Sequence, residues 1–152
     1  MKKYLFLPIL VFMAGCAGHE GEIGGREMDQ TVHDVDVKIK ESRTLSALGK
    51  LQASIADYYK TEKKIPANLE RLIPKYLADM PTVEIAVRGH KDNTKVQYYP
   101  SDIMRDGQVD GTRLKDTGKW GYTFNERQVI IFVDCTHPST RGSPWYQERG
   151  VY

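Results

Sequence analysis

Cys135 and His137 are the residues of this 152-residue chain that come closest to a catalytic pair. Residues two apart on a strand point to the same side, and a histidine base beside a cysteine can generate the nucleophilic thiolate. However, Cys135 follows a strongly apolar run, and no third group that would orient the histidine is identifiable. Three interpretations stay open: a structural thiol, a thiol that reacts or pairs with another molecule, and a hydrolase nucleophile. We expect the first of these, and therefore no catalytic residues and no enzyme.

Asp106 and Asp110 lie in a polar, Gly-rich stretch and match the first and fifth positions of an EF-hand calcium loop, with Gly111 at the sixth. The third position is Gln108, and the twelfth would be Thr117, which cannot supply a bidentate carboxylate. Asp106 and Asp110 are therefore candidate calcium ligands, and a solvated acidic loop is the alternative.

The four histidines of the chain are scattered, and none has the spacing of a metal-ligand motif such as His-x-x-x-His: His19, His33, His90 and His137. Zinc is therefore not expected. The chain also lacks a Cys-x-x-Cys-His motif, a Gly-rich phosphate loop and a Ser-centred nucleophile elbow. Calcium aside, we expect no cofactor.

The first sixteen residues have the order of an export signal. A basic start at Lys2 and Lys3 is followed by an apolar run over residues 4–13 and then by small residues and Cys16. The run is shorter than the roughly 20 apolar residues that span a bilayer. Its small-small-Cys ending resembles the site at which lipoprotein signal peptidase cuts, which implies a diacylglyceryl group on Cys16 and a membrane anchor. The alternative is an ordinary signal peptide, over residues 1–15, with an incidental cysteine.

Charge and cysteine content narrow the classes of partner. The formal net charge of +2 falls to about zero once a signal with two lysines and no acid is removed. A nucleic-acid-binding protein needs a basic surface, so we expect no nucleic-acid partner. With Cys16 lipidated, Cys135 is the remaining thiol and cannot form an intramolecular disulfide.

The rest of the chain predicts a lipidated flexible tether over residues 16–36 and one domain over residues 37–152. The tether is Gly-rich and polar and has no apolar periodicity. Apolar residues then recur every three or four positions from about 37 to 60, which predicts a one-sided helix. Residues 66–74, bounded by prolines, predict a short second helix.

The second half of the domain predicts strands. The best candidates are residues 120–124 and 128–133, joined by a hairpin at 125–127, and shorter candidates lie at 83–87 and 96–99. We expect residues 102–118 to be a loop and the tail from Thr136 to be irregular. A long helix, a short helix and an antiparallel meander make an α+β fold, in which the sheet buries one face on the long helix.

Two stretches of the chain carry a family resemblance. They are Ala53–Tyr59 continuing through Ile65–Leu77 to Met80-Pro81, and Gly118–Tyr122 followed by a turn and an apolar strand. These stretches resemble the globular part of type IV pilins and type II secretion pseudopilins, most closely the major pseudopilin. The resemblance implies a pilin-like fold, with a long N-terminal helix and a short second helix packed on a small antiparallel sheet. Major pseudopilins bind calcium in a loop of this region, so the resemblance also implies calcium near Asp106 and Asp110.

The N-terminal segment departs from the family. In pilins a prepilin peptidase cuts before the apolar segment, which stays on the mature chain as the first half of the long helix and packs in the fibre core. Here the apolar run precedes the cut, and the residues after Cys16 are polar. The comparison therefore implies a pilin-like head without the polymerising stalk.

Trp145 and Tyr146 lie in the irregular tail and are candidate partner contacts, because exposed Trp and Tyr favour interfaces. The alternative places the aromatic residues of the second half in the core of the sheet.

The sequence thus predicts a non-enzymatic pilin-like lipoprotein, anchored in the bacterial cell envelope and facing the periplasm. Ala17 after Cys16 favours the outer membrane, by the sorting habit of such lipoproteins. The implied partners are proteins of an envelope secretion or pilus machine. Two alternatives remain: a pilin-like head reused for ligand binding or surface adhesion, and a Cys/His-dependent enzyme.

Overall fold

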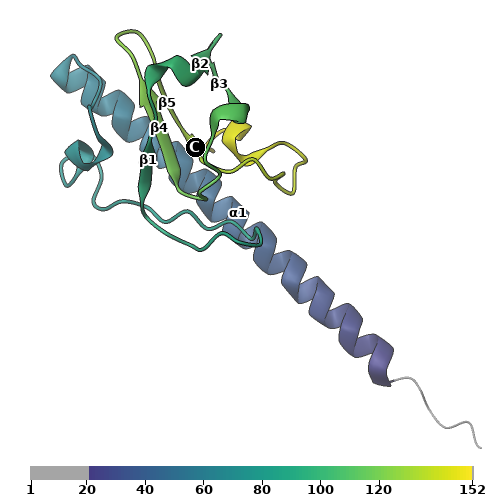
Figure 1. Ribbon diagram of the computed structural model, residues 1–152. Coiled ribbons are helices and arrows are strands. Elements are labelled where there is room, and N and C mark those ends of the chain that lie inside the picture. Colours follow the sequence, from purple (N-terminus) through teal and green to yellow (C-terminus); the bar gives the residue numbers. More distant parts are fainter. Residues whose placement is uncertain (1–20, 152) are drawn as a thin grey trace, which may run out of the picture.

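The longest element of the protein is a 42-residue helix, α1 (Gly21–Glu62). The computed structural model describes residues 21–151, with side chains from residue 28 onward. The predicted signal, the lipidation site Cys16 and the start of the tether lie outside the described residues. Figure 1 shows the N-terminal half of α1 projecting away from the domain, while its C-terminal half lies against the sheet. Within the described part of the chain, no helix is long and apolar enough to cross a membrane.

Residues 21–36 belong to α1, so the prediction that they form a flexible tether is wrong. A helix is costly to nucleate, but each residue added to an existing helix gains a hydrogen bond for the conformational freedom that it loses. The buried half of α1 supplies the nucleus, and the helix propagates outward from it.

The main sheet has three strands in the order β1-β4-β5: β1 (Val96–Tyr98), β4 (Trp120–Phe124) and β5 (Val129–Val133). β4 and β5 form the predicted antiparallel hairpin, with Trp120 opposite Val133. β1, however, pairs with β4 in parallel. The sheet is therefore mixed, and the prediction of a purely antiparallel meander is wrong. A parallel pair needs a crossover of a dozen or more residues, and the segment 99–119 provides one.

The predicted loop over 102–118 is partly structured. It contains a two-stranded hairpin of β2 (Met104–Arg105) and β3 (Gln108–Val109), flanked by the short 3₁₀ helices η2 (Ser101–Ile103) and η3 (Gly111–Arg113). The predicted second helix shortens to the 3₁₀ turn η1 (Leu69–Leu72).

The candidate strand at 83–87 is reduced to one bridge, between Val83 and Asn93. The alternation of apolar and other residues that suggested a strand still agrees with the burial pattern, since Val83 and Ile85 lie in the core.

The predicted packing of the sheet on the long helix is confirmed. Trp120 and Tyr122 of β4 lie in one buried cluster with apolar residues of β5 and of α1: Ile131, Val133, Leu45, Leu48, Leu51, Ile55 and Tyr58. A second buried cluster consists of Ile103, Val109 and Phe132. Side chains alternate along a strand, so Phe132 points to the opposite face of β5 from Ile131 and Val133, and the β2–β3 hairpin packs on that face.

The tail after β5 is part of the domain. Trp145, in the 3₁₀ turn η4 (Trp145–Gln147), is 2% exposed and belongs to the core. Its N–H donates to the carbonyl of His137, and the N–H of Val151 donates to the carbonyl of Leu45 on α1. The prediction of an irregular, accessible tail is wrong for Trp145, because burying the large indole outweighs the cost of ordering the segment.

Candidate metal centre

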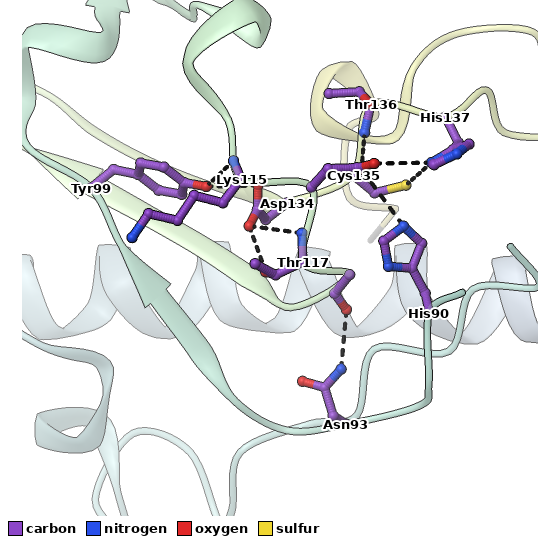
Figure 2. A network of polar contacts seen from close by, with 11 residues as sticks. His90, Asn93, Tyr99, Lys115, Thr117, Asp134, Cys135, Thr136 and His137 are labelled. Carbon is purple, nitrogen blue, oxygen red and sulfur yellow. Dashed lines mark hydrogen bonds and ion pairs between the residues drawn. The ribbon is translucent and has the colours of Figure 1, made fainter. Parts of the chain in front are cut away.

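Four side chains with metal-binding donor atoms converge beyond the end of β5: His90, Asp116, Cys135 and His137. One donor atom from each lies within 4.8 Å of the others. Figure 2 shows the side chain of His90, from one loop, pointing toward Cys135 and His137, which lie on the segment that follows β5. Among the residues that the structure describes, it is the one cluster of three or more His, Cys, Asp or Glu side chains whose donor atoms lie close enough together to hold a metal ion.

Cys135 and His137 are positioned by the chain as it leaves β5. Cys135 is fully buried, and its Sγ lies 3.6 Å from Nδ1 of His137. The expectation that these two side chains lie on the same side is confirmed. The N–H of Tyr146 donates to the carbonyl of Cys135 at 3.1 Å, so the tail holds this segment in place.

Asp116 enters from the turn before β4, with its backbone in the left-handed region at a φ of 54°. Its Oδ1 accepts a 2.8 Å hydrogen bond from the N–H of Thr136, and its Oδ2 lies 3.4 Å from Nδ1 of His137. Burial raises the pKa of Asp116, but the Thr136 N–H and the nearby His137 and His90 outweigh it, so the net pKa is lowered. The carboxylate is therefore ionised at neutral pH.

His90 completes the group from the loop after Val87. Its side chain is 8% exposed, and its ring packs edge-on against that of His137 with centroids 5.4 Å apart. The Nε2 atom is buried and has no hydrogen-bond partner, since Oδ1 of Asp116, at 3.6 Å, is too far away to accept a hydrogen bond. A Cβ at Gly118 would lie 2.7 Å from Nδ1 of His90, so only glycine leaves room for this ring.

A polar network behind the group holds its loops together (Figure 2). The buried carboxylate of Asp134 accepts hydrogen bonds from the N–H and the hydroxyl of Thr117, at 3.2 and 2.5 Å, and from the hydroxyl of Tyr99 at 2.8 Å. The side-chain amide of Asn93 donates to the carbonyl of Gly118 at 3.2 Å. The loops that carry His90 and Asp116 are thereby joined to each other and to the end of β5.

The thiol of Cys135 is poorly suited to nucleophilic catalysis. Burial raises its pKa to about 12, and the carboxylates of Asp116 and Asp134 add to the effect. A thiol in this state is almost entirely protonated at neutral pH, whereas the thiolate is the attacking species. The geometry suits a buried thiol or a metal ligand better than a hydrolase nucleophile.

Asp106 and Asp110, the candidate calcium ligands, lie apart from this group. Asp106 is in the β2–β3 turn, with a φ of 50°. Oδ1 of Asp110 accepts hydrogen bonds from the N–H and hydroxyl of Thr112 and thereby caps η3, while Oδ2 lies 3.7 Å from Arg105. Calcium binding by this pair stays a prediction.

The candidate partner contacts are placed differently from each other. Trp145 is in the core and is not accessible in this structure. Tyr146 is partly buried and lines a groove between α1, β5 and residues 147–150. A partner contact at Tyr146 stays a prediction.

His90, Asp116 and Cys135 are far apart in the chain and no local spacing connects them, so the sequence did not predict the candidate metal centre. A weak signal was present: His90 follows Gly89 and Asp116 comes two residues before Gly118, both with positive φ. Such turns are where a chain can bring a side chain close to another loop.

No protein-family model matches the chain, and no curated protein or solved structure matches it either.

Proposed function

We propose that this protein is a non-enzymatic, pilin-like accessory lipoprotein of a bacterial envelope secretion or pilus system. A lipid on Cys16 would hold it on the membrane, and the exposed half of α1 would bind a protein partner. The observation that carries the partner role is a row of exposed apolar side chains on that half of the helix.

The row consists of Met28, Val32, Val35 and Ile39, which are 72, 66, 51 and 44% exposed. Their spacing of four, three and four residues places them on one side of a helix that turns by about 100° per residue. The same spacing forms the apolar seam of a coiled coil, which a second helix covers. A single exposed apolar residue is ordinary, but four aligned ones are typical of a contact surface.

The row is not a continuation of the face that packs on the sheet. At about 100° per residue, Leu48, Leu51 and Ile55 lie on the opposite side of α1 from Val32 and Val35. The head therefore does not account for these apolar positions, and a partner helix that packs along the projecting half does. Asp29 and Asp36 lie along one edge of the row, as charged residues border the seam of a coiled coil.

The geometry of α1 also suits a tethered protein. The part of α1 from Gly21 to Lys40 rises by up to about 30 Å at 1.5 Å per residue. A lipid on Cys16 would lie five residues before the helix begins, so α1 would hold the head away from the membrane surface and leave the row accessible. The exposed half is too polar to replace the apolar stalk of a pilin, which supports an accessory role and not a filament subunit.

The pilin-like part of the proposal rests on the sequence resemblance together with the α+β layout of one long helix against a small sheet. The two alternatives, a head reused for ligand binding or adhesion and a Cys/His-dependent enzyme, lack an observation of equal weight. The raised pKa of Cys135 weighs against the enzyme.

Membrane fractionation of the Cys16→Ala variant tests the anchor. We expect the wild-type protein in the membrane fraction and Cys16→Ala in the soluble fraction. In cells given a labelled fatty acid, the wild-type protein should carry the label and Cys16→Ala should not. Cys135→Ser, which changes the other cysteine of the chain, is the matched control and should stay with the membrane. Unchanged fractionation of Cys16→Ala would contradict the proposal.

A further inference from the structure

We infer that His90, Asp116, Cys135 and His137 bind one zinc ion, which holds three loops of the domain together. This inference is independent of the proposed partner and of the anchor. It rests on the donor types, on the distances between them, and on a buried histidine nitrogen that has no other partner.

The donor types favour zinc over the calcium that the sequence suggested elsewhere. Two imidazoles, a thiol and a carboxylate supply nitrogen, sulfur and oxygen, a set typical of zinc sites. Calcium and magnesium prefer oxygen ligands alone. Four protein ligands also match the closed, four-coordinate arrangement of structural zinc sites.

The distances match a tetrahedral ion. Zinc bonds of about 2.0–2.3 Å place neighbouring ligand atoms of a tetrahedron about 3.3–3.8 Å apart. Sγ of Cys135 lies 3.6 Å from Nδ1 of His137, which lies 3.4 Å from Oδ2 of Asp116. Nε2 of His90 lies 3.6 Å from Oδ1 of Asp116. These three separations fall within that range, and all four donors lie within 4.8 Å of one another, so coordination would draw the most widely separated donors together by about 1 Å.

His90 provides an independent argument. Its side chain is more than nine-tenths buried, and its Nε2 atom is directed into the group without a hydrogen bond. Leaving a buried polar atom unpaired costs free energy, so such atoms usually have a partner that explains them. A zinc ion between the four donors satisfies Nε2, and Gly118 leaves the space that this ring needs.

Charge and surroundings agree with a divalent ion. Asp116 supplies one negative charge, and Cys135 supplies the second once zinc displaces the thiol proton to solvent, forming a zinc–sulfur bond. The ligand Asp116 is itself held by the N–H of Thr136, as second-shell donors hold ligands in zinc sites. His137, with 46% of its side chain exposed, provides the route by which the ion enters.

The consequence is structural. The four ligands come from the loop at 90, the turn at 116 and the segment at 135–137, which also anchors the tail through the His137 carbonyl. Cys135 is a free thiol, so a disulfide does not connect these loops. Because zinc binds the folded arrangement and not the separated loops, its binding free energy adds to the stability of the fold.

Metal titration of the detergent-solubilised full-length protein tests the inference. We expect one equivalent of Zn²⁺ to remain bound after dialysis, and a rise in melting temperature that calcium does not reproduce. Co²⁺ alone should give a tetrahedral visible spectrum and a thiolate-to-cobalt charge-transfer band. The band reports Cys135 directly.

Variants assign the ligands. Asp116→Asn, Cys135→Ser and His137→Gln should each weaken zinc binding by at least about tenfold, and Cys135→Ser should abolish the charge-transfer band. His33→Gln, at an exposed histidine of α1, is the matched control and should change neither. His137 is half-exposed, so its variant should fold even if the buried ones do not.

Substoichiometric zinc, a cobalt spectrum without the thiolate band, or unchanged affinity in His137→Gln would overturn the inference. The wild-type cobalt spectrum alone decides the question if a variant fails to fold.

Discussion

The carboxylate of Asp134, immediately after β5, accepts hydrogen bonds from both the N–H and the hydroxyl of Thr117, in the turn before β4. This contact ties the two ends of the β4–β5 hairpin together beside the candidate metal centre. Asp134 is fully buried, and the hydroxyl of Tyr99 donates to its other oxygen. The residue thus holds the turn that carries Asp116 without belonging to the candidate metal centre itself.

Replacing this carboxylate should destabilise the domain. In Asp134→Asn, an NH₂ group replaces one of the two carboxylate oxygens and faces the donors of Thr117 or Tyr99, which lose their acceptor. We therefore expect a loss of about 1–3 kcal/mol in the free energy of unfolding. Urea denaturation measures it. Asp57→Asn, at an exposed ion pair with Lys60, is the control and should change stability by no more than about 0.5 kcal/mol. Equal effects of the two variants would contradict the role given to Asp134.

Replacing Gly49 by alanine should destabilise the protein, although the same change stabilises most helices. In the middle of an exposed helix, Gly→Ala stabilises by about 1 kcal/mol. At Gly49, however, a Cβ would meet the carbonyl oxygen of Val151, so we expect Gly49→Ala to lower the free energy of unfolding by about 1–3 kcal/mol. Ser46→Ala, on the exposed face of α1, should not destabilise. A more stable Gly49→Ala protein would mean that the C-terminus does not pack there.

Trp145 should be the most costly residue of the tail to remove. Because its indole is in the core, Trp145→Ala should destabilise by about 3–5 kcal/mol, measured by thermal or urea unfolding. Arg149→Ala, at an exposed position of the same tail, should change little. A small effect at Trp145 would restore the interpretation of the tail as an accessible, irregular segment.

Tyrosine ionisation should separate buried from exposed hydroxyls. Burial raises the pKa of Tyr98 to about 12, and its hydrogen bond to Glu70 adds to this, although the N–H of Leu69 opposes it. Because the folded-state pKa is raised, the stabilisation that Tyr98 provides is complete below pH about 10 and is lost as the pH rises through about 12. Burial also raises the pKa values of Tyr99 and Tyr122.

Tyrosinate absorbance during alkaline titration checks this. We expect a late phase above pH 10 in the folded protein, which Tyr98→Phe reduces and urea abolishes. A single transition near pH 10 in the folded protein would contradict the raised pKa values of these hydroxyls.

The sequence predicted the elements that depend on local periodicity. The apolar spacing of Leu48, Leu51 and Ile55 predicted the buried half of α1, and the β-branched run at 129–133 predicted β5. It missed the parallel pairing of β1 because strand order depends on the path of the intervening segment. It missed the helix over 21–36 because that helix extends from a nucleus farther along the chain.

The candidate site was predictable only in part. The sequence could pair Cys135 with His137 because the two residues are only two positions apart. No local rule related them to His90 and Asp116, which tertiary contacts bring together. Trp145 was misplaced for a similar reason: proline and glycine indicate an irregular tail but do not show whether it packs.

The proposed partner role rests on the apolar row of α1, so its most direct test is a photo-crosslinking residue introduced at Val32 in cells. The same residue at His33, on another face of the helix, is the matched control. We expect an adduct with a membrane or envelope protein from position 32, a weak or absent adduct from position 33, and loss of the adduct when Cys16→Ala removes the anchor. Equal crosslinking from both positions, no adduct from position 32, or only an adduct between two copies of this chain would contradict it.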